Sequence, residues 1–290
     1  MTSGGLSVII PAYNEERAIG AVVTSVFDAL SGKVPGSLEV IVVDDGSTDG
    51  TAAAVPSGAV LVRHPKNTGY GRSLLSGIDR ASHDLIAIID ADGTYDPHDF
   101  GEMLPLSDTY DMIIGARRIE KQTVFVKALR LLLRSIILYF TGHHSPDPNS
   151  GMRIFRRDIV TSGRELFSLK FSFSTSLTVY SCMTNRFVSY VPIGYGDRTG
   201  ISKVRHVRDS LRTFFLILSM GLMFRSGHCI FAQMILFLLG GGLLAVFGLI
   251  GPGFWGIATG ITWIVLHLTV LAAFQAYIMS RLYERLRDRP

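Results

Sequence analysis

The sequence contains few cysteines and few charged residues for its length. Only two of its 290 residues are cysteines, Cys182 and Cys229, which excludes a disulfide scaffold and a zinc site with four cysteine ligands. Charged residues make up 18% of the chain, against about 25% in an ordinary soluble domain, and 48% of the residues are hydrophobic. This apolar excess excludes a disordered chain and disfavours a wholly water-soluble globule.

Two nucleotide-binding motifs are absent from the sequence. No Gly-x-Gly-x-x-Gly follows the first expected strand, and no Gly-Lys-Ser/Thr loop occurs anywhere. The first motif is typical of dinucleotide-binding folds and the second of P-loop nucleotidases. A dinucleotide oxidoreductase and a P-loop ATPase are therefore disfavoured.

A long stretch near the end of the chain lacks charge altogether. No Asp, Glu, Lys or Arg occurs in the 55 residues from Ser226 to Ser280. A membrane-spanning helix needs about 20 apolar residues, so we expect two spans, at about 230–250 and 257–279, joined by a turn at 251–253. Arginines flank both outer ends, which puts these ends on the cytoplasmic side by the positive-inside rule. A buried helical hairpin of a soluble core is the alternative.

The charges that are present are divided unequally. Residues 1–116 carry 6 Lys/Arg and 16 Asp/Glu, whereas residues 117–290 carry 22 and 8. An acidic first part suits a metal ion or a nucleotide ribose. The basic second part is interleaved with Leu, Ile and Phe, which favours a membrane surface or a phosphate-bearing partner over nucleic acid.

Short apolar runs alternate with helical patterns over residues 6–116. The patterns predict strands and helices in the order strand 6–10, helix 16–30, strand 38–43, strand 60–62, helix 70–81, strand 85–89 and strand 112–114. Continuous apolar strands separated by helices indicate an α/β fold with a mostly parallel sheet covered on both faces. Ligands of such sheets bind beyond the carboxyl ends of the strands.

Polar loops follow three of these strands. They read PAYNEE at 11–16, DDGSTDG at 44–50 and DADG at 90–93. Asp90 and Asp92 are carboxylates on alternate residues, a spacing that can hold Mg²⁺ or Mn²⁺ shared with a diphosphate. A solvated turn is the alternative for this pair. A turn, or a cap on a following helix, is the alternative for Asp44 and Asp45.

Taken in order, these loops resemble glycosyltransferase family 2 enzymes with the GT-A fold. The matching stretches, within about the first 205 residues, are VIIPAYNEE at 8–16, VVDDGSTDGT at 42–51, NTGYGRSLLSGI at 67–78, DADGTYDP at 90–97, PNSGMRIFRR at 148–157 and VPIGYGDRTGISK at 191–203. Within the family the chain is similar to the polyprenyl-phosphate glycosyltransferases, the dolichol-phosphate-mannose-synthase-like branch. Many bacterial members of that branch carry amphipathic helices and two spans after the catalytic domain.

The resemblance implies a role for each matching residue. The nucleotide-sugar donor would be bound by Pro11, Ala12, Tyr13, Asn14, Glu15, Asp44, Asn67, Gly69, Asp90, Ala91, Asp92, Arg198 and Lys203. Asp90 and Asp92 would be catalytic and would hold Mg²⁺ or Mn²⁺, and the positions of Arg117 and Asp147 make them the other candidate catalytic residues. The chain departs from the family at Thr94, where dolichol-phosphate mannose synthases often have a glutamine that can join the metal shell.

The acceptor side is predicted from a basic amphipathic segment. Residues 121–142 combine a wide apolar face with cations at Lys127, Arg130 and Arg134, which predicts an interfacial helix over about 121–141, with a third span as the alternative. Arg117, Lys127 and Arg130 are candidates for binding the acceptor phosphate. Headgroup attraction alone is the alternative for Arg134. Asp147 is expected to position the acceptor, to act as a base, or to be structural.

The expected organisation has three parts: a cytoplasmic GT-A catalytic domain over 1–205, a juxtamembrane amphipathic segment over 206–228, and two transmembrane helices with a basic tail over 229–290. The expected function is inverting transfer of one sugar from a UDP- or GDP-sugar to undecaprenyl or dolichyl phosphate. The reaction would take place at the cytoplasmic face of a bacterial inner membrane, in cell-envelope glycosylation. The expected partners are these two substrates, the lipid membrane and a second copy of the chain through the hairpin, with no nucleic acid.

Two other functions stay open. One is a family 2 glycosyltransferase that acts on a lipid or glycan hydroxyl, and the other is a catalytically inactive membrane scaffold. A processive polysaccharide synthase is disfavoured because its Gln-x-x-Arg-Trp motif is absent. The only tryptophans, Trp255 and Trp263, lie in the expected hairpin.

Overall fold

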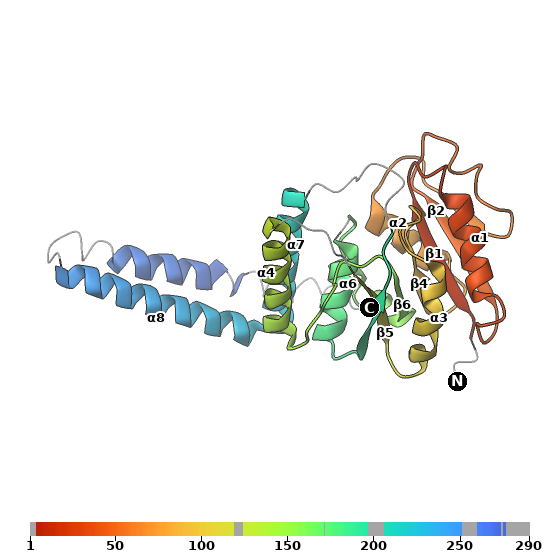
Figure 1. The fold of residues 1–290 in the computed structure, drawn as a ribbon. Coiled ribbons are helices and arrows are strands. Elements are labelled where there is room, and N and C mark those ends of the chain that lie inside the picture. The colour runs from red at the N-terminus through yellow and green to blue at the C-terminus, as the bar shows by residue number, and fades with distance from the viewer. Residues whose placement is uncertain are drawn as a thin grey trace, which may run out of the picture. The chain divides into compact units, whose positions relative to one another are not determined.

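A seven-stranded sheet in the order β3-β2-β1-β4-β6-β5-β7 is the frame of the first part of the chain (Figure 1). The computed structural model describes residues 4–118, 124–170, 172–196, 206–250, 260–273 and 275–276. The strands are β1 (Leu6–Ala12), β2 (Leu38–Asp44), β3 (Val60–Arg63), β4 (Leu85–Ile88), β5 (Met112–Arg117), β6 (Arg153–Arg156) and β7 (Val188–Ile193).

Helices follow most of the strands. They are α1 (Ile19–Leu30), α2 (Tyr70–Arg80), α3 (Phe100–Met103), α4 (Val124–Thr141), α5 (Arg157–Ser162), α6 (Phe173–Met183), α7 (His206–Phe224) and α8 (Ser226–Ile250). Short 3-10 turns at Pro97–Asp99, Leu104–Asp108 and Arg164–Leu166 complete the described elements. The α/β class predicted from the sequence is confirmed. The predicted helix at 16–30 begins later, at Ile19, and residues 16–18 form a turn before it.

The sheet is mostly parallel, with one reversed strand. β1 pairs in parallel with β2 and β4, β2 with β3, and β5 with β7. β6 runs antiparallel to both of its neighbours, β4 and β5. The carboxyl ends of the parallel strands therefore meet at one edge, and the first residue of β6, Arg153, lies there opposite Ile88 and Ile114. The sequence analysis did not predict β6.

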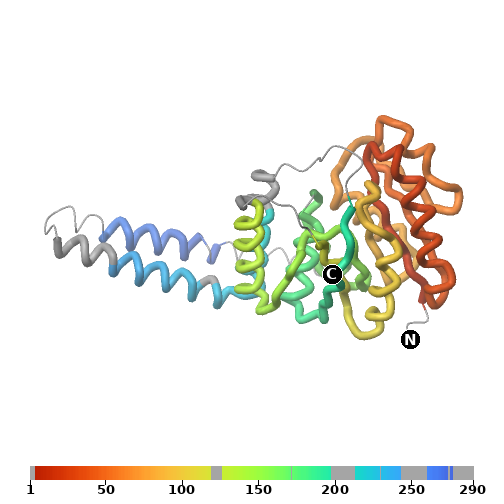
Figure 2. The backbone as a smooth tube through the Cα atoms, in the orientation of Figure 1, coloured from red at the N-terminus to blue at the C-terminus, as the bar shows by residue number. Residues whose placement is uncertain are grey.

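Both faces of the sheet are buried, as continuous apolar strands require. One face packs its alternating side chains against α1 and α3 in a core that includes Val8, Ile10, Ala87, Ile113 and Ile154. The opposite face of β1 and β2 carries α2, and α6 packs beside α2 and α5. The helix α4 packs on α6 (Figure 2).

The chain divides into two compact units, Met1–Ile217 and Leu218–Pro290. In the second unit, α8 and a helix over Gly260–Ala273 run side by side (Figures 1 and 2). Trp263 packs on Gly240, where a Cβ atom would overlap the indole ring, and its Nε1 donates to the Phe237 carbonyl oxygen at 3.3 Å. Large apolar side chains along both helices are exposed.

The predicted membrane spans stay a prediction. Within the described residues no helix taken alone has the length and apolar character needed to cross a bilayer. The pair Thr213–Phe224 and Ser226–Gly242 meets that requirement jointly, with a bend of 109° between its halves. The expected turn at 251–253 and the last part of the second span lie outside the described residues.

Gly77 provides a test of how closely α2 packs on the sheet. A Cβ atom at Gly77 would overlap the Ile9 side chain and lie 3.2 Å from Val43. We expect Gly77→Ala to destabilise the protein by about 1–3 kcal/mol through overpacking, despite the better helix propensity of alanine. The measurement is urea-induced unfolding followed by circular dichroism.

Gly101 in α3 is the control, because a Cβ atom there meets nothing within 4 Å. Gly101→Ala should leave the free energy of unfolding unchanged or raise it slightly. Equal stability of the two variants would contradict the close packing of α2 on β1.

Candidate active site

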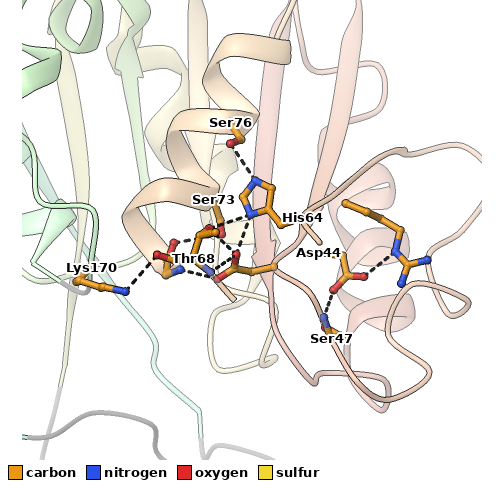
Figure 3. A network of polar contacts seen from close by, with 10 residues as sticks. Asp44, Ser47, His64, Thr68, Ser73, Ser76 and Lys170 are labelled. Atoms are coloured by element: carbon orange, nitrogen blue, oxygen red, sulfur yellow. Dashed lines mark hydrogen bonds and ion pairs between the residues drawn. The ribbon is translucent and has the colours of Figure 1, made fainter. Parts of the chain in front are cut away.

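The loops after β1 and β2 bind each other at the edge of the sheet. Asn14 takes a left-handed backbone conformation, with φ of 53°. Its amide donates to Ser47 Oγ at 3.0 Å, and its Oδ1 accepts from the Thr48 amide at 2.9 Å. Asp44, fully buried, accepts from the Ser47 amide at 2.9 Å and from Arg63 Nε at 3.1 Å (Figure 3). These hydrogen bonds hold the two predicted donor-binding loops together as one wall of the site.

The remaining predicted residues of these loops lie beside that wall. Pro11 and Ala12 end β1 and are buried, Tyr13 is partly buried, and the Glu15 amide donates to Thr51 Oγ1 at 2.8 Å. Residues 46–59 form turns and bends. The alternative of a helix cap at Asp44 and Asp45 is therefore wrong.

Asp45 organises the loop that leads into α2. Its carboxylate accepts from His64 Nδ1 at 2.7 Å, from the Thr68 amide at 2.9 Å and hydroxyl at 2.7 Å, and from the Gly69 amide at 2.7 Å. Burial opposes ionisation of Asp45, but these hydrogen bonds outweigh it and hold the pKa of the carboxyl below its ordinary value. His64 Nε2 is 3.0 Å from Ser76 Oγ (Figure 3). The position of Gly69 is therefore fixed by a carboxylate in the loop after β2.

Asp90 and Asp92 lie just beyond β4, and each accepts a hydrogen bond from the hydroxyl group of another residue. Tyr70 donates to Asp90 Oδ1 at 2.9 Å, and Thr94 donates to Asp92 Oδ1 through its hydroxyl at 2.7 Å and its amide at 3.1 Å. Burial and the charge of Asp90 raise the pKa of Tyr70 well above its ordinary value. Ala91, between the two carboxylates, is buried.

Gly151 closes the space beside Asp90. A Cβ atom at this position would overlap the Asp90 carboxylate, and the Gly151 amide donates to the Tyr95 hydroxyl at 2.8 Å. Tyr95 packs edge-on against Tyr195, with ring centroids 5.2 Å apart, and the Arg117 guanidinium lies 5.1 Å from the Tyr195 ring centroid. Aromatic rings thus connect the carboxylate pair with the basic side of the site.

Arg117 and Asp147 form a bidentate ion pair on that basic side. Arg117 Nε lies 2.6 Å from Asp147 Oδ2, and Nη2 lies 2.9 Å from Oδ1. Burial opposes the charge on both partners, but their contact outweighs it. The pKa of Arg117 is raised and the pKa of Asp147 is lowered. Asp147 is therefore a poor proton acceptor near neutral pH.

A basic recess opens beside this pair. It is lined by Arg117, Arg130, Leu133, Arg134, Pro146, Asp147, Pro148 and Asn149. Burial and the neighbouring charge of Arg117 lower the pKa of Arg130. Lys127, one turn earlier on α4, is exposed and does not line the recess. Arg134 does line it, although the sequence left this residue open to a headgroup role.

The buried Arg153 holds the loop between these two sides. Its Nη1 donates to the Ser174 carbonyl at 2.9 Å and to the Thr178 hydroxyl at 3.2 Å. Its Nη2 donates to the carbonyl oxygens of Pro148 and Ser150. The guanidinium of Arg153 therefore holds the loop 147–151 through two of its carbonyl oxygens.

The residues around Asp90 and Asp92 fit a divalent cation that is shared with a substrate. Carboxylate oxygens suit Mg²⁺ and Mn²⁺, and Gly151 carries no side chain that would overlap the Asp90 carboxylate. No group of three or more His, Cys, Asp or Glu side chains suited to a metal gathers in the part of the chain that the structure describes. Two carboxylates with substrate phosphates as the other ligands is a usual arrangement for such ions.

The predicted site residues differ in where the structure places them. Asn14, Asp44, Gly69, Asp90, Asp92, Arg117 and Asp147 come from separate loops to the carboxyl edge of the sheet. Asn67 and Lys127 are exposed, and Arg198 and Lys203 lie outside the described residues. Sequence reasoning did not single out Tyr70, Tyr95, Arg153 and Tyr195. The signal that could have found them is their position, because all four lie within the stretches that match the family, at 67–78, 90–97, 148–157 and 191–203.

Comparison with known proteins identifies the family. The family model of glycosyl transferase family 2 matches residues 7–163, more than half of the chain. The chain belongs to glycosyl transferase family 2. The matched region of this family 2 chain contains the loops after β1, β2 and β4, the recess and Arg153.

Curated relatives of this family 2 chain include two named transferases. An undecaprenyl-phosphate 4-deoxy-4-formamido-L-arabinose transferase of Aeromonas hydrophila is 31% identical over 163 residues, which cover 53% of this chain and 50% of the relative. A low-salt glycan biosynthesis hexosyltransferase of Haloferax volcanii is 29% identical over 231 residues, covering 76% and 55%. The chain spans about half the length of these relatives.

Solved structures show the same fold. Glucosyl-3-phosphoglycerate synthase of Mycobacterium tuberculosis, crystallised with Mn²⁺, UDP-glucose and phosphoglyceric acid, has a TM-score of 0.62 at 22% identity, covering 75% of this chain and 80% of that one. A structure of the same enzyme with Mg²⁺ and UDP also has a TM-score of 0.62, at 23% identity, covering 74% and 79%. The GT-A-like fold of the family 2 chain is confirmed.

Asp45 gives a testable dependence of stability on pH. Because its pKa is lower in the folded than in the unfolded state, its stabilising effect is fully present above the unfolded pKa of about 3.9 and is lost as the pH falls through the folded pKa. We expect Asp45→Asn to lower the free energy of unfolding at pH 7 by about 1.5–3 kcal/mol, as for hydrogen bonds to a charged group. The difference should shrink at pH 3, as measured by urea-induced unfolding.

Asp28→Asn serves as the control, because Asp28 is exposed on α1. This variant should match the wild type at both pH values. A loss of stability in Asp45→Asn that stays constant down to pH 3 would contradict the account based on ionisation.

Proposed function

We propose that this family 2 glycosyltransferase moves one sugar, with inversion, from a UDP- or GDP-sugar to a polyprenyl phosphate such as undecaprenyl phosphate. The observation that carries the proposal is a recess with three arginines at the same sheet edge as two adjacent carboxylates. The carboxylates suit a metal-bound diphosphate, and the arginines suit a second, phosphate-bearing substrate. A site that binds two anionic substrates would need a metal-binding carboxylate pair for one of them and a cluster of cations for the other.

The donor would lie over the loops after β1, β2 and β4. The interlocked Asn14 and Asp44 loops form a wall for the base and ribose, and Gly69 approaches from the loop held by Asp45. When bound at Asp90 and Asp92, Mg²⁺ or Mn²⁺ supplies charge neutralisation for the departing diphosphate. The solved structures that hold UDP with these ions in the same fold support the assignment.

The acceptor phosphate would enter the basic recess. Arg130 and Arg134 lie one turn apart on α4 and both line it. Asp147 occupies the Nε–Nη2 edge of Arg117, which leaves the Nη1 edge to contact phosphate. A phosphate monoester is already an anion at neutral pH, so it needs orientation and charge neutralisation rather than a base. Asp147 then acts by positioning Arg117.

This role of Asp147 also bears on the alternative of a hydroxyl acceptor. A hydroxyl nucleophile requires a general base whose pKa lies near the working pH. The pKa of Asp147 is held low, and both of its oxygens accept from Arg117. A phosphate acceptor is therefore favoured over a lipid or glycan hydroxyl.

The surface of α4 supports an acceptor that resides in a membrane. Ile137 and Phe140 are buried, whereas Leu131, Leu132 and Leu138 are at least 45% exposed on the same helix. Exposed leucines next to arginines are typical of a helix that lies at a membrane interface. The second unit, with its exposed apolar helices, would anchor the enzyme in the membrane. Both ends of this helical hairpin would face the cytoplasm. A second copy of the hairpin would be a further partner.

The direct test is transfer by the purified full-length protein in nanodiscs. UDP- and GDP-sugars are supplied one at a time with Mn²⁺ and undecaprenyl phosphate, and the lipid product is separated by thin-layer chromatography. We expect one donor to give a glycosylated lipid phosphate, and undecaprenol, which lacks the phosphate, to give none. Transfer to undecaprenol at the same rate, or no transfer with any donor, would contradict the proposal.

The recess predicts which cations on α4 matter for the acceptor. Arg130→Ala should raise the KM for lipid phosphate by about ten- to a hundredfold, because a charge-assisted hydrogen bond contributes about 1.5–3 kcal/mol. The KM for the nucleotide sugar should change little. Lys127→Ala should raise the acceptor KM less than Arg130→Ala, because Lys127 lies outside the recess.

Steady-state kinetics with each substrate varied in turn give both constants. Equal increases in the two KM values for Arg130→Ala would move this residue to the donor side. A larger effect of Lys127 than of Arg130 would show that the phosphate binds outside the recess.

A further inference from the structure

The two carboxylates of the proposed metal site are each held by a hydroxyl from a different element. Tyr70, the first residue of α2, bonds Asp90 Oδ1 at 2.9 Å. Thr94, two residues beyond Asp92, bonds Asp92 Oδ1 at 2.7 Å. One oxygen of each carboxylate thus receives a directed donor, which restricts the rotation of the carboxylate plane.

The backbone that carries Tyr70 is held from both sides. The preceding residue, Gly69, donates its amide to Asp45 at 2.7 Å, and Lys170 Nζ donates to the Thr68 carbonyl at 3.2 Å. A Cβ atom at Gly71 would overlap the Ser168 carbonyl oxygen, so the following residue also packs tightly. Tyr70 therefore presents its hydroxyl to Asp90 from a fixed support.

Thr94 is held equally well. It is 3% exposed, and its amide also donates to Asp92 Oδ1, at 3.1 Å. Its carbonyl accepts from the Gly196 amide at 2.8 Å. With its hydroxyl bonded to Asp92, a side chain this short serves the carboxylate rather than extending past it as a ligand.

We propose that Tyr70 and Thr94 are positioning residues, which orient Asp90 and Asp92 toward a divalent cation and the diphosphate of the donor. The inference rests on the proposed function, since it takes these carboxylates as the metal ligands. Outer-shell hydrogen bonds to ligating groups typically contribute about 10–100-fold in metal affinity. Both hydroxyls can be removed with little change in side-chain volume, so the proposal can be tested by substitution.

The experiment measures Mn²⁺ binding rather than turnover. Free Mn²⁺ is titrated against the full-length protein in nanodiscs by electron paramagnetic resonance, with saturating UDP and, separately, GDP. We expect Tyr70→Phe and Thr94→Val each to raise the Kd for Mn²⁺ by about 10–100-fold. Thr94→Ser, which keeps the hydroxyl, should restore affinity close to that of the wild type.

Two controls separate positioning from a general loss of structure. Tyr180 is a buried tyrosine that, like Tyr70, donates its hydroxyl to a side chain, here Ser162 Oγ at 3.2 Å, but it lies on α6. Tyr180→Phe should bind Mn²⁺ as the wild type does. Thermal unfolding without metal should give similar midpoints for Thr94→Val and Thr94→Ser.

The possible outcomes distinguish the inference from the proposed function. If the wild type binds no Mn²⁺ with either nucleotide, the proposed metal-dependent donor site is wrong. If the wild type binds but Tyr70→Phe and Thr94→Val bind equally well, the positioning roles are overturned and the donor site stands. Equal losses in Thr94→Ser and Thr94→Val, or in Tyr180→Phe and Tyr70→Phe, would overturn them as well.

Discussion

The enclosed guanidinium of Arg153 is the constraint on which the rest of the site depends. A cation without access to water must be surrounded by oxygen atoms, because an unpaired buried charge costs several kcal/mol, on the order of 3–5 when a partner is removed. The Nη1 and Nη2 groups of Arg153 meet this requirement with the carbonyl oxygens of residues 148, 150 and 174. The oxygens of residues 148 and 150 belong to the loop just before β6, which places Asp147 against Arg117 and Gly151 against Asp90. The proposed donor site at Asp90 and the proposed acceptor site at Arg117 thus both depend on Arg153, the first residue of β6.

Much of the fold could be predicted from the sequence, because parallel sheets follow simple rules. Short apolar runs separated by helical patterns located β1 to β5, with ends that differ by only a few residues from those observed. Since the carboxyl ends of parallel strands share an edge, the loops at Asn14, Asp44 and Asp90 could be brought together without a structure. The membership of glycosyl transferase family 2 was indicated by those same loops. The predictable features were therefore the strands, which follow from local periodicity, and the meeting of their loops, which follows from the sheet topology.

The remainder could not be predicted, because it depends on contacts between distant residues. Arg117 and Asp147 are 30 positions apart, and nothing in either segment indicates a bidentate pair. The helix α6 is buried at every residue although five of its eleven residues are Ser or Thr, so it shows no apolar stripe. Its hydroxyls bond within the helix, as Thr178 does to the Ser174 carbonyl at 3.0 Å, or to residues outside it, such as Asn149 for Thr175 and Arg153 for Thr178. The strand β6, four residues with arginine at each end, resembles an exposed loop in the sequence.

The charge of the basic recess also bears on how a product would leave. Three arginines face a single aspartate there, so the recess keeps an excess of positive charge in its resting state. A lipid phosphate monoester carries about −1.5 to −2 charges near neutral pH, whereas the glycosylated phosphodiester carries only one. Attraction to the recess therefore weakens once the sugar has been transferred. If the recess binds the lipid phosphate as proposed, the arginines that attract the acceptor would hold its glycosylated form more weakly and so favour its release.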